Sequence, residues 1–269
     1  MTIRLVAVDL DDTLLRKDWT LSERTVETVR LVQARGVDVT IASGRLPRSA
    51  ARYAEQLQIE CPLICGHGAI VIDLKKDEIL YYQGLPRDVA LSVVDGIYAL
   101  NLHCQLYYRG VSWTEKENDL SHYMARLSGL RPSLTDFRSL LETDGSQGMV
   151  DKVIAVGSAE AIEEAYRNLG RQFGALAHIA TSKSTILEVT ALGVDKGRAL
   201  CFLAAHLGID RREIMAIGDG RNDLEMIKYA GIGVAMANAH PDLKEAASFV
   251  TYSNEEDGVA WALEQFILK

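Results

Sequence analysis

The chain begins with an apolar run that ends in a cluster of acidic residues. Residues 3–8 are rich in β-branched side chains and have the length of a buried strand in a parallel sheet. Asp9-Leu10-Asp11-Asp12-Thr13 follows directly. In open α/β sheets, ligands bind just beyond the carboxyl ends of such strands. The pattern therefore predicts three carboxylates at a position where ligands bind.

The rest of the first third alternates strand and helix patterns. A helix begins after Ser22, carries valines at helical spacing and ends at Gly36. A second buried strand over 37–42 runs into Ser43-Gly44-Arg45, and a helix over 48–57 follows. A third strand over 62–65 ends in Gly66-His67-Gly68. This alternation is typical of a doubly wound parallel sheet.

The middle of the chain has a different pattern. Residues 70–72 and 79–82 predict a hairpin, and from about Leu85 to about Glu188 helical and strand-like stretches no longer alternate regularly. Most tyrosines also lie here. We expect an α+β insertion with its own small core, built from helices over 88–100, 117–127 and 159–173 and strands over 103–108, 153–156 and 186–189.

The last part returns to the first pattern. Helices over 197–207 and 224–230 alternate with strands over 214–217 and 233–236. The sequence therefore predicts an α/β protein in which residues 1–84 and 190–269 form a Rossmann-like, doubly wound parallel-sheet core. Residues 85–189 form an inserted α+β cap domain.

Composition narrows the possible functions. The 269 residues are 48% hydrophobic and 25% charged, which is ordinary for a globular protein. The net charge of −8 argues against a nucleic-acid binder, and no apolar segment approaches the ~20 residues of a membrane span. Acidic residues interrupt the N-terminal apolar run, which argues against a targeting leader peptide. The four cysteines do not have the spacing of a zinc-binding motif. We expect a cytoplasmic protein that is a monomer or a small homo-oligomer and binds neither nucleic acid nor membrane.

The candidate chemistry lies at the ends of the predicted strands. In one parallel sheet these ends converge at the same edge, and Lys196 opens the helix that follows Val194-Asp195. Carboxylates suit Mg²⁺, while hydroxyl, amide, ammonium and helix N-terminal groups suit phosphate oxygens. Each group alone also has a structural explanation as a turn, a helix start or an N-cap. The combined set is Asp9, Asp11, Ser43, Gly44, Lys196, Asp219, Asn222 and Asp223.

Four segments in order resemble the motifs of the haloacid dehalogenase superfamily of phosphatases. The chain is similar to the Cof-like subgroup, in which a large α/β cap is inserted between the second and third motifs. The resemblance spans nearly the whole chain and rests on residues 9–15, Ser43-Gly44-Arg45, Asp195-Lys196-Gly197 and Gly218-Asp219-Gly220-Arg221-Asn222-Asp223.

The resemblance implies a role for each of these residues. Asp9 would attack phosphorus to form an aspartyl-phosphate, and Asp11 would protonate the leaving alcohol and then deprotonate water. Mg²⁺ would bind the Asp9 carboxylate, the Asp11 backbone carbonyl and Asp219, with Asp223 supporting it directly or through water. The phosphate- and substrate-binding residues would be Leu10, Ser43, Gly44, Arg45, Lys196 and Asn222.

Two positions depart from the family pattern. Asp12 stands where the family often has glycine, a variant that also occurs there. His67-Gly68-Ala69 stands where the subgroup usually has Asn-Gly-Ala, so His67 either contacts substrate or fills the same turn. Arg45 either reaches the distal part of the substrate or is an ordinary solvated arginine.

The sequence therefore predicts a Mg²⁺-dependent phosphatase whose partner is a small phosphorylated metabolite. From the family, a sugar phosphate is the leading substrate class, and the cap is expected to close over the core. A phosphomutase would use the same aspartyl-phosphate, and a non-catalytic phosphometabolite-binding module is a further alternative. A dehalogenase is disfavoured because its chemistry needs neither Mg²⁺ nor the second carboxylate.

Overall fold

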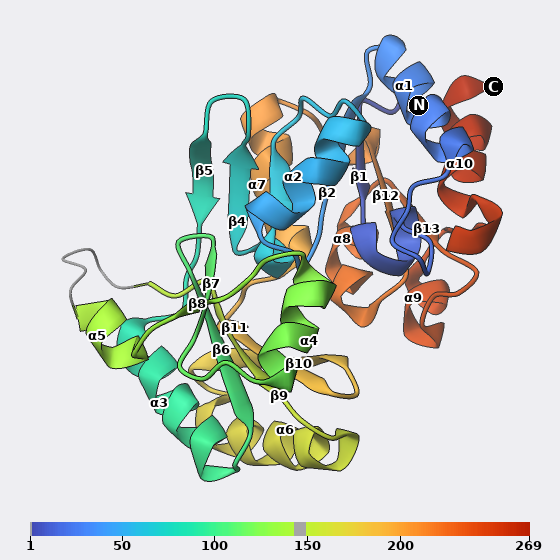
Figure 1. Cartoon of the computed structure of the whole chain (residues 1–269). Coiled ribbons are helices and arrows are strands. Elements are labelled where there is room, and N and C mark those ends of the chain that lie inside the picture. The colour runs from blue at the N-terminus through green and yellow to red at the C-terminus, as the bar shows by residue number, and fades with distance from the viewer. Residues whose placement is uncertain (1, 143–148) are drawn as a thin grey trace. The chain divides into compact units, whose positions relative to one another are not determined.

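The computed structural model describes residues 2–142 and 149–269, and their contacts group into two compact units. Unit 1 comprises Met1–Tyr82 and Asp195–Lys269, and unit 2 comprises Gln83–Val194 (Figure 1). The sequence pattern predicts these boundaries at 84/85 and 189/190. The second unit extends further because strand β11 (Ile186–Ala191) remains paired to its end.

The main sheet of unit 1 is parallel throughout. Its five strands lie in the order β14-β13-β12-β1-β2, and each adjacent pair is parallel. All four residues of β1, an interior strand between β12 and β2, are buried, as expected for a strand covered on both faces. The strands are β1 (Leu5–Val8), β2 (Asp38–Ile41), β12 (Ile214–Gly218), β13 (Ile232–Ala235) and β14 (Phe249–Val250).

Helices connect these strands, and this arrangement confirms the predicted α/β fold class. The Ser22 side chain accepts a hydrogen bond from the Thr25 amide and caps α1 as predicted. The helices of unit 1 are α1 (Glu23–Ala34), α2 (Pro47–Gln56), α7 (Lys196–Leu207), α8 (Leu224–Tyr229), α9 (Pro241–Ala246) and α10 (Gly258–Leu263).

The third predicted strand lies mainly in a different sheet. β3 (Leu63–Cys65) pairs antiparallel with β4 (Ile70–Asp73), which pairs with β5 (Glu78–Tyr82). Only one parallel bridge, Ala42 to Ile64, joins it to the end of β2. The short turn after β3 brings the chain back beside that strand, so its ladder forms with the predicted hairpin.

Unit 2 contains a six-stranded sheet in the order β10-β11-β9-β6-β7-β8. Its pairings are antiparallel except for β7 with β8. Besides β11 the strands are β6 (His103–Tyr108), β7 (Val111–Thr114), β8 (Ser133–Leu134), β9 (Lys152–Val156) and β10 (Ala177–Lys183). The helices are α3 (Arg87–Ala99), α4 (Asp119–Ser128), α5 (Phe137–Glu142) and α6 (Ala159–Phe173).

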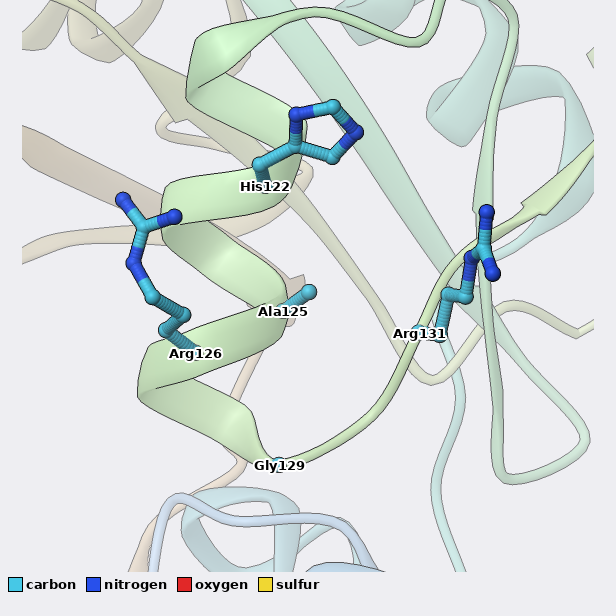
Figure 2. Close-up of a pocket in the computed structure, with 5 residues that line it drawn as sticks. All are labelled: His122, Ala125, Arg126, Gly129 and Arg131. Atoms are coloured by element: carbon cyan, nitrogen blue, oxygen red, sulfur yellow. The ribbon is translucent and has the colours of Figure 1, made fainter.

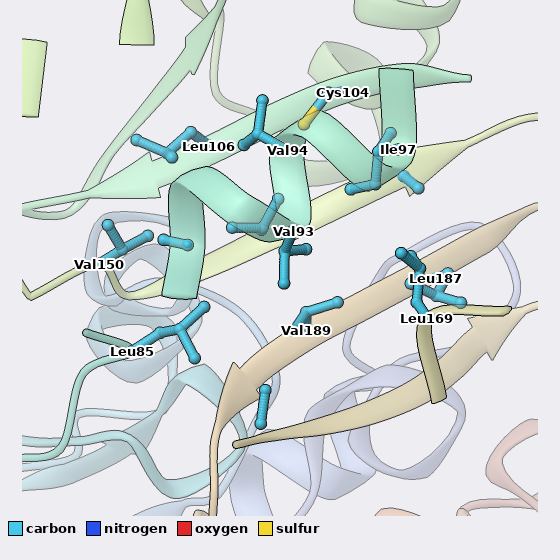
Figure 3. Packing of buried hydrophobic residues seen from close by; sticks show 14 of the residues in the cluster. Leu85, Val93, Val94, Ile97, Cys104, Leu106, Val150, Leu169, Leu187 and Val189 are labelled. Atoms are coloured by element: carbon cyan, nitrogen blue, oxygen red, sulfur yellow. The ribbon is translucent and has the colours of Figure 1, made fainter. Parts of the chain in front are cut away.

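One face of this sheet carries the core of unit 2. Alternate residues of β6, such as Cys104 and Leu106, pack with Val93 and Ile97 of α3 and with Leu169 of α6 (Figure 3). The insertion therefore has a hydrophobic core of its own. Within the described residues, no helix combines the length and the apolar character that a membrane crossing requires.

Candidate active site

The register of the main sheet brings the predicted acidic segments together. Val8 at the end of β1 is paired with Ile41 of β2 on one side and with Ile217 of β12 on the other. The next residues of all three strands therefore leave the sheet at the same edge. These residues are Asp9, Ala42-Ser43 and Gly218-Asp219.

Three carboxylates form the centre of this edge. One carboxylate oxygen each from Asp9, Asp219 and Asp223 lie within 4.8 Å of one another, a spacing that could hold a metal ion. Asp9 and Asp223 are buried, and Asp219 is partly exposed. Oxygen ligands from carboxylates are those that hard divalent cations such as Mg²⁺ prefer.

Lys196 lies between two of these carboxylates. It is the first residue of α7 and is fully buried. Its Nζ donates to Asp9 Oδ1 and to Asp223 Oδ1, both at 2.5 Å. Burial alone would lower the pKa of Lys196, but the charges of Asp223 and Asp9 outweigh it and raise that pKa. The ammonium group therefore stays charged beside Asp9.

Asp223 uses both of its oxygens within the protein. While Oδ1 accepts from Lys196, Oδ2 accepts from the backbone amides of Asp219 at 3.0 Å and Gly220 at 2.8 Å. A side chain at Gly218 would come within 2.6 Å of this carboxylate, so the close approach requires glycine there. Asp223 thus fixes Lys196 and the backbone after β12.

Thr13 contacts the acidic cluster and lies outside the predicted set of site residues. Its hydroxyl donates to Asp219 Oδ1 at 2.8 Å and orients that carboxylate. The signal was present, because Thr13 belongs to the same short segment as Asp9. The contact itself joins residues on two different strand exits, and only the sheet register reveals it.

Two carboxyl groups of the acidic cluster, those of Asp9 and Asp219, have raised pKa values. Burial raises the pKa of Asp9 well above its usual value, Lys196 opposes the shift, and Asp223 and Asp219 add to it. Burial and the Asp223 charge raise the pKa of Asp219 to about 7. Additional positive charge would lower both values, so the cluster favours a cation.

Asp11 lies apart from the three clustered carboxylates. Its carboxylate accepts two hydrogen bonds from Arg45, from Nε to Oδ2 at 2.8 Å and from Nη2 to Oδ1 at 2.6 Å. The Asp11 side chain is 44% exposed and that of Arg45 is 8% exposed. The next residue, Asp12, has a φ of 59°, a left-handed conformation that aspartate tolerates better than most side chains.

His67, in the segment after β3, contacts the segment that follows β2. Its backbone amide donates to the Ser43 carbonyl at 3.0 Å, and its ring lies where a side chain at Gly44 would be. The ring Nδ1 is 3.3 Å from Asn222 Nδ2. His67 therefore connects Ser43, Gly44 and Asn222, three of the residues expected to bind phosphate or substrate.

Leu10 begins the turn that carries the acidic segment. It is buried, and its carbonyl accepts from the Leu15 amide at 2.9 Å. Asn238, another residue outside the predicted site, donates from Nδ2 to the Asp12 carbonyl at 2.8 Å and holds the turn in place. The site residues expected from the sequence thus all lie at this edge of unit 1 or in contact with it.

A separate hollow lies in unit 2 and contains none of the predicted site residues. Its volume is about 400 Å³, and its lining comes from α4 and the segment after it (Figure 2). Glu117 binds both His122 at 3.2 Å and Arg131 at 3.3 Å. The hollow contains none of the clustered carboxylates, so the acidic edge of unit 1 is the candidate active site.

Known proteins are similar to this chain over nearly its whole length. A family model described as haloacid dehalogenase-like hydrolase matches residues 6–263. The putative phosphatase YxeH of Bacillus subtilis is 30% identical over 269 residues, covering 98% of both proteins. The 5-amino-6-(5-phospho-D-ribitylamino)uracil phosphatase YitU of the same organism is 31% identical over 281 residues, covering 97% of both.

A solved structure supports the same relationship. The crystal structure of a haloacid dehalogenase-like hydrolase from Bacteroides thetaiotaomicron superposes with a TM-score of 0.89 at 31% sequence identity. The similarity covers 98% of this chain and 99% of that one. Both units are therefore part of the shared architecture.

Proposed function

We propose that this chain, which belongs to the haloacid dehalogenase-like hydrolase family and is a phosphoric monoester hydrolase, is a Mg²⁺-dependent phosphatase acting through an aspartyl-phosphate on Asp9. The observation that carries the proposal is the charge balance at the sheet edge. Three clustered carboxylates face one buried ammonium group, which leaves a net charge of two negative units in the ionised state. A divalent cation would neutralise it.

The donor set fits Mg²⁺. We assign the metal to the carboxylates of Asp9 and Asp219 and the backbone carbonyl of Asp11. Asp223, whose oxygens already accept three hydrogen bonds, supports the site through Lys196 and the backbone after β12. Bound Mg²⁺ would supply positive charge that offsets the repulsion between a carboxylate and a phosphate dianion.

In the first step, an Asp9 carboxylate oxygen forms a bond to phosphorus while the bond from phosphorus to the leaving oxygen breaks. The Asp11 carboxyl group gives its proton to that oxygen, so the leaving group departs as an alcohol. Lys196, 2.5 Å from Asp9 Oδ1, is placed beside the reacting oxygens and stabilises their negative charge.

In the second step, water attacks the phosphorus of the aspartyl-phosphate and Asp11 takes its proton. The bond from phosphorus to Asp9 breaks, and its electrons restore the Asp9 carboxylate as phosphate leaves. Asp9 and Asp11 thus have separate tasks. Their different surroundings, a buried cluster for one and a partly exposed ion pair for the other, support this division.

The proposed substrate is a small phosphorylated metabolite, with a sugar phosphate as the leading class. The name of the relative YitU describes a substrate whose phosphate is attached to a ribityl chain, which is a sugar alcohol. We also propose a reducing compartment such as the cytoplasm, because Cys61, Cys65, Cys104 and Cys201 are all free thiols.

Phosphate release from a panel of phosphorylated sugars, nucleotides and cofactors tests the function. We expect release to stop in Asp9→Asn and in EDTA, and to return in EDTA-treated enzyme when Mg²⁺ is added. Asp18→Asn, which alters an exposed aspartate bound to Thr20, is the matched control and keeps its activity. Metal-independent turnover, or conversion to an isomeric sugar phosphate without free phosphate, would contradict the proposal.

A further inference from the structure

We propose that Arg45 is a positioning residue that fixes the Asp11 carboxylate for its two proton transfers. This inference rests on the proposed function, because it gives Asp11 the acid–base task. Its basis is the two-pronged contact of Arg45 Nε and Nη2 with the two oxygens of Asp11, at 2.8 and 2.6 Å. Such paired, charge-assisted hydrogen bonds fix the orientation of a carboxylate as well as its distance.

Arg45 is itself held firmly by its surroundings. Its amide donates to Ser43 Oγ at 3.1 Å, and its carbonyl accepts from the Gly66 amide at 2.9 Å. Its Nη1 donates to Ser49 Oγ at 3.2 Å, and its guanidinium carbon lies 5.3 Å from the centroid of the Tyr53 ring. These contacts on both the backbone and the side chain make Arg45 a rigid support.

Asp11 needs such a support more than Asp9 does. Asp9 is buried and bound to Lys196, whereas the Asp11 side chain is 44% exposed. A half-exposed side chain in water moves between rotamers. Proton transfer requires the carboxyl group to stay within hydrogen-bond reach of the reacting oxygen, and a misplacement of about 1 Å can cost about 10²-fold in rate.

The contact leaves Asp11 able to react. Each carboxylate oxygen has two lone pairs, so the two bonds from Arg45 leave one on each oxygen available to hold the proton that Asp11 transfers. Arg45 in turn uses three of its N–H groups on Asp11 and Ser49. Most of its five N–H donors are thus engaged with Asp11 and Ser49, and a double-mutant cycle distinguishes a role through Asp11 from direct phosphate binding.

Two esters that differ in their need for an acid test the inference. An alkyl phosphate such as β-glycerol phosphate needs a proton on its leaving oxygen, whereas 2,4-dinitrophenyl phosphate releases a stable anion. The quantity to compare is kcat/KM, which reports the steps up to cleavage of the ester bond. We expect Arg45→Ala to lower it by about 10- to 100-fold for the alkyl ester and by less than about threefold for the aryl ester.

A double-mutant cycle separates positioning from phosphate binding. If Arg45 acts through Asp11, adding Arg45→Ala to Asp11→Asn causes little further loss with the alkyl ester. Arg45→Lys, which keeps the charge but not the paired geometry, is expected to restore only part of the rate. Arg24→Ala is the matched control, because Arg24 makes the same paired contact with Glu264 at 3.1 and 2.8 Å elsewhere in unit 1.

Equal losses with both esters in Arg45→Ala, or additive losses in the double variant, would overturn the inference and assign Arg45 to phosphate binding. Thermal unfolding of each variant checks that it is folded. If Arg45→Ala does not fold, the two esters are compared in Arg45→Lys. Selective loss in Asp11→Asn without selective loss at Arg45 contradicts this inference alone. No phosphate release by the wild type from either ester overturns the proposed function as well.

Discussion

At the residue scale, Lys196 is the cation that balances two carboxylates of the acidic cluster. It is a fully buried cation bonded to two buried carboxylates, so its charge is compensated without water. Removing one partner of such a group leaves the other charged and buried, which is strongly destabilising. The same contacts place an ammonium group beside the proposed nucleophile. We therefore propose that the stability of the site and its reactivity depend on the same hydrogen bonds.

The raised pKa of Asp219, about 7, predicts how Mg²⁺ stabilisation varies with pH. Because the folded carboxyl group holds its proton more tightly than the unfolded one, the metal-free protein loses stability as pH rises from about 4 to about 7. Mg²⁺ requires the ionised carboxylate and removes this penalty. We therefore expect Mg²⁺ to raise the melting temperature more at about pH 8 than at about pH 6. A shift of equal size at both pH values in thermal unfolding would disagree.

Thr13 predicts a change in metal affinity. Thr13→Val keeps the shape of the side chain but removes the 2.8 Å hydrogen bond to Asp219. Losing a partner that orients a metal ligand typically weakens metal affinity by about 10- to 100-fold. The Mg²⁺ concentration for half-maximal activity should rise accordingly, while the rate at saturating Mg²⁺ changes little. Thr20→Val, which alters an exposed threonine bonded to Asp18, is the control.

The sequence could predict which residue types gather at this edge, but not how they pair. Asp9, Ser43 and Asp219 follow apolar strands, and their convergence follows from the parallel sheet. The contact between Arg45 and Asp11 has no local signal, because it joins residues 34 positions apart. Such pairs depend on side-chain directions that the tertiary structure alone determines.

At the scale of elements, the strands of the parallel core were the most predictable part. Buried on both faces, β1 and β12 form continuous apolar runs that stand out in the sequence. β3 has the same apolar character, yet its ladder forms with β4 in a second sheet. The apolar pattern of a strand predicts that it is buried. Which sheet β3 joins depends instead on the short turn that follows it.

That turn packs against the helix that carries Lys196. Gly68 has a φ of +104°, and a side chain there would come within 2.2 Å of the Asp195 carbonyl. Gly68→Ala would force apart the turn and the start of α7. We expect the variant to lose stability by about 1–3 kcal/mol from backbone strain and up to about 10²-fold in kcat from displacement of Lys196.

Denaturant unfolding and steady-state kinetics measure both effects. Gly36→Ala is the matched control, since Gly36 also has a positive φ, +78°, but has open space around it. It should lose some stability and keep its kcat. Equal losses of kcat in the two variants would mean that the contact with Asp195 has no part in positioning Lys196.

At the scale of the whole molecule, the chain divides the fold between two units with separate sheets and cores. The catalytic and metal-binding residues proposed above all belong to unit 1. Unit 2 is a single continuous segment with a hydrophobic cluster of its own, so we propose that it is a domain that folds independently.

Excision tests that division. The fragment 83–194 should unfold cooperatively and give the dispersed amide spectrum of a folded α+β domain in nuclear magnetic resonance. It should release no phosphate from any ester, because it lacks the whole acidic cluster. An unfolded fragment would show that the core of unit 2 is insufficient by itself.

We propose that Asp9 carries the phosphoryl group during the reaction. The most direct measurement is mass spectrometry of peptides from acid-quenched enzyme turning over 2,4-dinitrophenyl phosphate with Mg²⁺. Asp11→Asn should accumulate the intermediate, because it lacks the base that activates water. We expect one added phosphoryl group on the peptide that contains Asp9, and none on that peptide in Asp9→Asn. Phosphate release without any adduct at Asp9, or undiminished release by Asp9→Asn, would contradict the proposal.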